Sequence, residues 1–268
     1  MKANDQRKGI LSTIRLLVLI GCLAINLSPA ASHSEQGAKP PGQGETFVPS
    51  DVDSAHPIYE SSFNDPSELK DWLLEGGKQM RIANGNLILE SDAKNEKNHL
   101  VCWLKKEAPA DFLLEFTLRP MDRKNGLNIV FFSARGIKGE SIFDPSLKPR
   151  DGTYEQYRQG DIKCYHVSYW AAGRETANMR KSPGFFLVAE GRDLIYQAPN
   201  DVFQTVQIYK RGGNIRVIVD DVVALAYDDD GVTYGPVYDH AGWIGLRQMG
   251  KTRSCEYGHI KIYPLKRR

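Results

Sequence analysis

Short stretches of alternating apolar and polar residues, separated by turn-forming residues, make up most of the chain after residue 58. Such alternation is typical of β-strands with one buried face. The pairs Asn84-Gly85, Gly212-Gly213 and Asp220-Asp221 separate neighbouring stretches and predict tight hairpins. We expect strands at residues 80–83, 87–90, 100–104, 112–118, 126–134, 162–170, 184–190, 203–210, 214–220, 222–227, 243–248 and 259–263.

Helix signals are scarce, and the clearest is Asp65 as a cap with Pro66 at the first helical position. Many short strands with hardly a helix predict an all-β sandwich of two antiparallel sheets, or jelly roll. Residues 135–161 form a long connection between two strands. A connection of this length in a compact domain is usually functional.

The strand at 162–170 and the connection that follows it are the most informative part of the sequence. One face of this strand presents Lys163, Tyr165, Val167 and Tyr169, and the other presents Cys164, His166, Ser168 and Trp170. The connection between this strand and the one expected at 184–190 carries Arg174, Asn178, Arg180 and Lys181. Aromatic faces beside imidazole and guanidinium groups suit sugars, which stack on rings and form hydrogen bonds at their edges. A core strand with satisfied Tyr and His side chains is the alternative.

The N-terminus predicts export. Basic residues precede an apolar run at 16–27, and Ser28-Pro29-Ala30 offers a cleavage point, so residues 1–30 are interpreted as a signal peptide. The run is too short to span a bilayer, which takes about 20 residues. Alternatively Cys22, in Leu19-Ile20-Gly21-Cys22, is the lipidated residue of a lipoprotein, the one case in which we expect a membrane partner. Residues 31–57 are interpreted as a flexible linker and 58–268 as the folded domain.

Charge and cysteine content exclude several other classes. The net charge of +2 over 268 residues shows no basic stripe, so nucleic acid is not an expected partner. Without the signal peptide the chain keeps Cys102, Cys164 and Cys255, which permit one disulfide among them or three buried thiols. No zinc-binding spacing occurs, and neither a metal site nor a cofactor is predicted.

The order of strands from Gly212-Gly213 to the final Ile260-Lys261-Ile262 resembles the concanavalin A-like lectin/glucanase superfamily over residues 58–265. More narrowly, Tyr165-His166-Val167-Ser168-Tyr169, then Asn178-Met179-Arg180-Lys181 and Gly184-Phe185, resemble the YesU-like bacterial family of unknown function. This resemblance implies a concanavalin A-like jelly roll of two antiparallel sheets and an association with the breakdown of pectin-like polysaccharides. It implies no settled activity.

Two chemistries can be compared on these residues. A retaining glycosidase needs two carboxylates about 5 Å apart, and no Glu-x-Asp-x-x-Glu pattern occurs. A lyase instead needs a group that neutralises the uronate carboxylate and a base that removes the neighbouring proton. We predict His166, Tyr165 and Tyr169 as catalytic residues, although the adjacent Tyr165 and His166 point to opposite faces of a regular strand. Predicted substrate-binding residues are Asn128, Tyr157, Trp170, Asn178, Arg180, Lys181, Trp243 and Arg247.

The alternative for Trp243 and Arg247 is a cation–π pair on an outer sheet face, and the resemblance favours Arg247 as a cleft residue. Together these observations predict an exported protein that acts on an acidic, uronate-containing poly- or oligosaccharide, with lyase-type elimination as its chemistry. A binding protein with the same concave cleft and no turnover is the competing hypothesis. A surface module tethered through Cys22 is a third.

Overall fold

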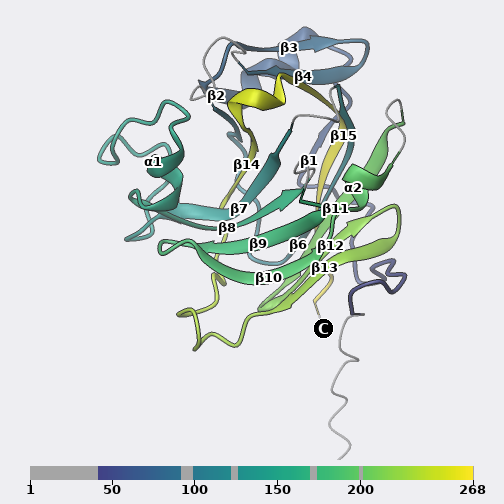
Figure 1. Ribbon diagram of the computed structural model, residues 1–268, viewed down its shortest axis with the longest axis vertical. Coiled ribbons are helices and arrows are strands. Elements are labelled where there is room, and N and C mark those ends of the chain that lie inside the picture. The colour runs from purple at the N-terminus through teal and green to yellow at the C-terminus, as the bar shows by residue number, and fades with distance from the viewer. Residues whose placement is uncertain (1–41, 92–98, 122–125, 170–173, 199–201, 268) are drawn as a thin grey trace, which may run out of the picture. The chain divides into compact units, whose positions relative to one another are not determined.

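The computed structural model describes residues 42–91, 99–121, 126–169, 174–198 and 202–267. In these residues the chain folds into two β-sheets that pack face to face (Figure 1). Neighbouring strands are antiparallel throughout both sheets. The prediction of an all-β sandwich of two antiparallel sheets is confirmed.

Strands from distant parts of the sequence alternate within each sheet. The eight-stranded sheet runs in the order β13 (Val222–Asp228), β12 (Asn214–Val219), β11 (Gln204–Arg211), β6 (Phe112–Pro120), β15 (Ser254–Pro264), β4 (Asn86–Glu90) and β3 (Gln79–Ala83), with β1 (Tyr59–Ser61) paired to β15. The seven-stranded sheet runs in the order β10 (Phe186–Arg192), β9 (Thr176–Ser182), β8 (Ile162–Tyr169), β7 (Asn128–Gly136), β14 (Trp243–Gln248), β5 (Leu100–Leu104) and β2 (Trp72–Gly76).

The predicted tight turns form as the residue types require. Asn84 and Gly85 join β3 to β4 with φ values of 54° and 69°. Asp220 and Asp221 join β12 to β13 with φ values of 47° and 64°. Two successive residues with positive φ match the right-handed twist of the flanking strands, and Gly, Asn and Asp tolerate this conformation best.

Helices are short in the described residues. They are α1 (Tyr154–Arg158), α2 (Leu194–Gln197) and the 3₁₀ turns η1 (Pro66–Asp71) and η2 (Gly250–Thr252). The expected turn at Pro66 is η1, where the Asp65 side chain accepts from the Ser67 amide and Glu68 completes a capping box. No helix in the described part of the chain has the length and apolar character needed to cross a membrane.

The main core lies between the two sheets. Alternate residues of β7 and β8 enter it, including Val130, Phe132, Tyr165 and Val167. The residues between them point to the opposite face of the seven-stranded sheet and form a second apolar cluster with Trp103, Phe131 and Tyr157. We call this opposite face the site face. Cys102, Cys164 and Cys255 are all buried thiols, and no disulfide joins any two of them.

Residues 42–57 differ from the expected flexible linker. The amide of Gly44 donates to the Val223 carbonyl at 2.8 Å, and the amide of Phe47 donates to the Asp221 carbonyl at 2.9 Å. The Phe47 ring packs edge-on against Tyr209, with centroids 5.3 Å apart. The low apolar content of residues 42–57 predicts a flexible linker. Hydrogen bonds between main-chain groups at a strand edge, however, need few apolar side chains, so this segment is held in place.

Candidate functional site

The site face carries two lateral rows of residues, each formed by register partners on successive strands. The first row is Glu75, Val101, Arg247, Ile129, Ser168, Asn178 and Glu190. The second row is Leu73, Trp103, Gly245, Phe131, His166, Arg180 and Leu187. Polar side chains from strands far apart in sequence are therefore aligned across one surface.

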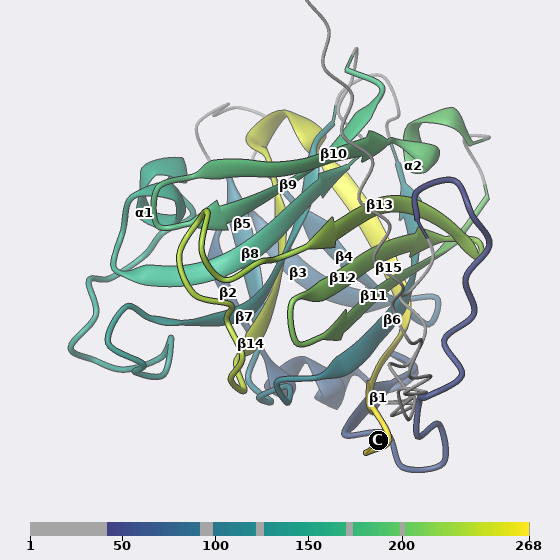
Figure 2. The same cartoon turned by 90° about the horizontal axis from the view of Figure 1, so that it is seen from below.

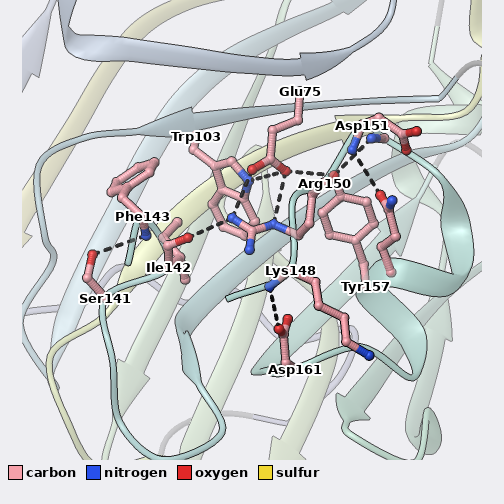
Figure 3. Close-up of polar contacts among 12 residues, drawn as sticks. Glu75, Trp103, Ser141, Ile142, Phe143, Lys148, Arg150, Asp151, Tyr157 and Asp161 are labelled. Carbon is pink, nitrogen blue, oxygen red and sulfur yellow. Dashed lines mark hydrogen bonds and ion pairs between the residues drawn. The ribbon is translucent and has the colours of Figure 1, made fainter. Parts of the chain in front are cut away.

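Residues 137–161, which include α1 and which we call the covering loop, lie over the β2, β5 and β14 side of this face. Glu75 on β2 fastens the loop (Figure 3). Its carboxylate accepts from Tyr157 Oη at 2.6 Å, from Arg150 Nη2 at 2.8 Å and from Trp103 Nε1 at 2.9 Å. The Tyr157 ring then stacks on Phe131, with centroids 5.6 Å apart. Figure 2 shows α1 beside the margin of the sheet.

A pocket of about 200 Å³ opens on the part of the site face that the covering loop leaves free. Its floor comes from β7, β8 and β9, and its sides come from α1, the β9–β10 turn and the residues at the ends of β7 and β14. The lining residues are Leu127, Ile129, Tyr154, His166, Ser168, Arg174, Asn178, Arg180, Phe185 and Met249.

Two aromatic rings from different connections meet above the floor. Tyr154 of α1 and Phe185 of the β9–β10 turn lie 5.6 Å apart, centroid to centroid, at 88°. Phe185 also lies edge-on to His166 at 5.3 Å. His166 is thereby only 5 % exposed although it lines the pocket.

Guanidinium groups dominate the charge of this region. Arg180 donates to the Phe185 carbonyl at 3.0 Å and lies 4.3 Å from the centre of that ring. Arg174 donates to Ser168 Oγ at 3.0 Å. None of the lining residues that the structure describes is an Asp or Glu. Among the described residues, neither arginine forms an ion pair with a carboxylate.

Arg247 is buried beside the pocket, with 1 % of its surface exposed. Its guanidinium carbon lies 5.2 Å from the Tyr154 ring centre and 5.4 Å from that of Tyr157. Nε and Nη2 have no hydrogen-bond partner in the structure. Burial lowers the pKa of Arg247 to about 10, so the group remains a cation at neutral pH.

His166 is the neutral counterpart of these cations. Burial, together with the positive charges of Arg247 and Arg180, lowers the pKa of His166 to about 3. Its Nε2 atom is buried without a hydrogen-bond partner. A neutral imidazole with one free nitrogen can accept a proton or a hydrogen bond from a ligand.

Three of the predicted site residues lie together in the pocket, namely His166, Asn178 and Arg180. Arg247 lies directly behind them, and Tyr157 lies beneath the covering loop. Trp243 is on the site face but packs against Phe143 and Arg135, away from the pocket lining. Trp170 lies outside the described residues.

The other predicted residues point to the opposite side of the sheet. Tyr165 and Tyr169 belong to the core between the sheets, since they alternate with His166 along β8. Lys181 is buried in an ion pair with Asp229 at 2.7 Å. Asn128 donates to Cys255 Sγ at 3.1 Å within the core. The structure therefore does not bring these four residues to the pocket.

Sequence reasoning missed several lining residues. Tyr154 lies in the long connection that we expected to be functional but was not predicted as a site residue. Arg174 was noted in the connection after the strand at 162–170 but was not among the predicted binding residues, and nothing in the pattern showed that both would line one pocket. Phe185 follows Gly184 in a turn, and its positive φ of 56° directs the chain over His166. In the described part of the chain, no group of three or more His, Cys, Asp or Glu side chains could hold a metal ion.

Residues 56–262 match the model of a domain of unknown function, DUF1961. The chain belongs to the DUF1961 family. It is 36 % identical over 219 residues to the uncharacterized protein YesU of Bacillus subtilis (strain 168), a match that covers 79 % of this chain and 97 % of YesU. The family resemblance predicted from the residues of β8 and β9 is confirmed.

Solved structures place this DUF1961 domain among galectin-like and concanavalin A-like sandwiches. A Bacillus subtilis protein of unknown function with a galectin-like fold is 32 % identical, with a TM-score of 0.73, and the match covers 81 % of this chain and 100 % of that one. The catalytic domain of an endo-1,3-β-glucanase (laminarinase) from Thermotoga petrophila RKU-1 shares the fold at 13 % identity and a TM-score of 0.54, over 79 % and 98 % of the two chains.

Proposed function

We propose that the DUF1961 pocket binds a uronate unit of an acidic saccharide. The observation that carries this proposal is the gathering of Arg174, Arg180 and Arg247 around one pocket whose described lining residues include no carboxylate. A buried cation without a negatively charged partner is costly, and an anionic ligand would offset that cost. The planar guanidinium group also matches the geometry of a carboxylate.

The remaining lining residues suit a sugar ring. Asn178 and Ser168 offer hydrogen-bonding groups beside the arginines, while Tyr154 and Phe185 offer ring surfaces. The laminarinase that shares the fold acts on a carbohydrate, which supports this class of ligand by analogy. Among the described residues the lining has no Asp or Glu, which disfavours a retaining glycosidase, because that enzyme needs a pair of carboxylates.

Isothermal titration calorimetry with galacturonate oligomers and size-matched neutral oligomers tests the proposal. Arg180→Ala removes a charge-assisted contact of about 1.5–3 kcal/mol and is expected to weaken the binding of acidic oligomers at least about tenfold. Neutral oligomers should bind weakly to both proteins. Arg81→Ala is the matched control, because Arg81 is 44 % exposed on β3 of the other sheet. Equal affinity for acidic and neutral oligomers, or no binding of either, would overturn the proposal.

Elimination is the second candidate function, and the free Nε2 of His166 favours it. In this reaction an arginine neutralises the uronate carboxylate, His166 Nε2 takes the C5 proton, and the C4–O bond breaks to leave a C4=C5 double bond. Tyr154, which also lines the pocket, is the group available to protonate the departing O4 oxygen.

Ultraviolet absorbance of the unsaturated product measures this reaction directly. His166→Gln is expected to lower turnover by about 10²–10⁴-fold, as for the loss of a general base, and to change the affinity for acidic oligomers much less. If the unmodified protein binds acidic oligomers and releases no unsaturated product from any of them, elimination is rejected and binding alone stands.

A further inference from the structure

The site face is open over only part of its width. A saccharide lying across a sheet would follow a lateral row such as the first row, from Glu190 on β10 to Glu75 on β2. Between β14 and β2 that row is buried, since Val101 is 0 % exposed and Arg247 is 1 % exposed. The covering loop occupies this half, where its Arg150 forms an ion pair with Glu75.

An aromatic wall closes the pocket where the covered half begins. Tyr154 stands over Arg247, with the guanidinium carbon 5.2 Å from its ring centre. The same ring meets Phe185 of the β9–β10 turn, with the ring centroids 5.6 Å apart. A chain passing along the first row beyond Ile129 would have to displace Tyr154. The open side lies over β9 and β10, where Glu190 is exposed.

The volume of the pocket also points to a single unit. Pockets for drug-sized ligands measure roughly 300–1,000 Å³. The pocket of about 200 Å³ falls below that range. It offers room for one sugar ring. Among the described residues, the pocket lining does not extend beyond the wall formed by Tyr154 and Phe185.

We propose that the pocket takes the terminal unit of an acidic saccharide, and that the rest of the saccharide leaves over β9 and β10. This inference rests on the proposed function, since it assumes a uronate ligand. It adds a distinction between substrates: chain ends and short oligomers are bound, and units in the interior of a long chain are not.

Calorimetry with galacturonate oligomers of one to six units tests the inference on the unmodified protein. The affinity is expected to level off by the second unit, because added units find no further contacts. A groove with more subsites would instead gain about tenfold for each added contact of about 1.4 kcal/mol. Long polygalacturonate should bind one protein per chain end, whatever its length.

The two proposals fail in different ways. If no oligomer of any length binds, the uronate ligand itself is wrong. If affinity rises steadily to six units and many proteins bind along one polymer, the pocket is a through-groove and only this inference is overturned.

The double variant Tyr154→Ala with Phe185→Ala tests the wall independently. Opening it is expected to weaken binding of the shortest oligomers and to let affinity rise with length. Phe186→Ala is the control, because Phe186 is the next residue in the chain but packs near Tyr234, outside the pocket lining. Length dependence that is identical in the double variant and the control would show that Tyr154 and Phe185 are not the barrier.

Discussion

His166 and Arg247 share one buried region, and burial acts on both in the same direction. Desolvation disfavours the charged form of each group, so it lowers the pKa of His166 to about 3 and that of Arg247 to about 10. At neutral pH the arginine keeps its charge and the histidine has none. A carboxylate can therefore be held by one group while the other, being neutral, stays available as a hydrogen-bond acceptor.

The lowered pKa of His166 makes stability depend on pH. In the unfolded chain this side chain takes up a proton near pH 6.5, whereas in the folded protein it does so near pH 3. Between these values the unfolded state binds more protons, so the free energy of unfolding falls as the pH falls, by about 1.4 kcal/mol per pH unit for this group. In the His166→Gln variant the free energy of unfolding should therefore fall less steeply between pH 7 and pH 4 than in the unmodified protein, as measured by urea unfolding. If the free energy of unfolding depends on pH in the same way in both proteins, the pKa of His166 is not lowered in the folded state.

Sequence predicts the faces of β8 correctly but not their roles. Alternation puts Tyr165 and His166 on opposite faces, as observed. Both faces carry aromatic and polar groups, so the pattern cannot tell which face meets the core. Partners distant in sequence decide it: the Tyr165 hydroxyl donates to Asp229, and the amide of Tyr238 donates to that hydroxyl. The same limitation led to the wrong placement of Tyr169. Lys181 was misplaced for another reason: we expected a connection there, whereas Thr176–Ser182 form β9 and Lys181 lies on its core side, as the register partner of Tyr165.

At the scale of elements, the covering loop determines the shape of the site. Its length between β7 and β8 can be seen in the sequence and predicts a functional role. Its position depends on Glu75, which lies 75 residues before Arg150 and 82 before Tyr157. A contact between residues so far apart produces no local pattern in the sequence. The residues next to Glu75 in the chain also give no sign that its carboxylate binds a distant loop.

Glu75→Gln tests how the loop is held. Removing one partner of a buried ion pair leaves the other charge uncompensated and typically costs about 3–5 kcal/mol. We expect a loss of this order in urea unfolding, together with faster proteolytic cleavage within residues 137–161 of the native protein. The matched control is Glu60→Gln, whose partner is Lys261 and whose side chain is 52 % exposed. An exposed pair contributes about 0–1 kcal/mol. Equal effects of the two variants would mean that Glu75 does not fasten the loop.

For the whole molecule, the sequence predicts the fold more completely than the site. Period-two alternation and the turn residues Asn84-Gly85 and Asp220-Asp221 are local signals, and they identify most of the strands. The order of strands within each sheet places β14 beside both β5 and β7, a pairing of distant segments that local patterns do not encode. The pocket depends on that order.

Export and the thiol count can be tested together. We expect the mature protein to begin near Ala31 and to contain three thiols, since the full chain has four cysteines and Cys22 lies in the removed segment. Burial raises the pKa of Cys164 to about 12, so it should react slowly with a thiol reagent in the native state. Unfolding should release three reactive thiols, and intact-mass analysis should give the N-terminus. A diacylglycerol adduct on Cys22 would establish a lipoprotein instead.

Residues 42–57 also have a bearing on solubility. β13 is the terminal strand of its sheet, and the exposed main-chain groups of such a strand invite pairing with another molecule. Residues 44–47 occupy the first part of this edge, and Asp51 ties the segment down by accepting from Tyr209 Oη at 3.0 Å and Arg211 Nε at 2.9 Å. A fragment starting at residue 56, where the family match begins, would leave that first part of the edge bare. Such a fragment would be prone to aggregate through its own β13, although every residue of the pocket would still be present.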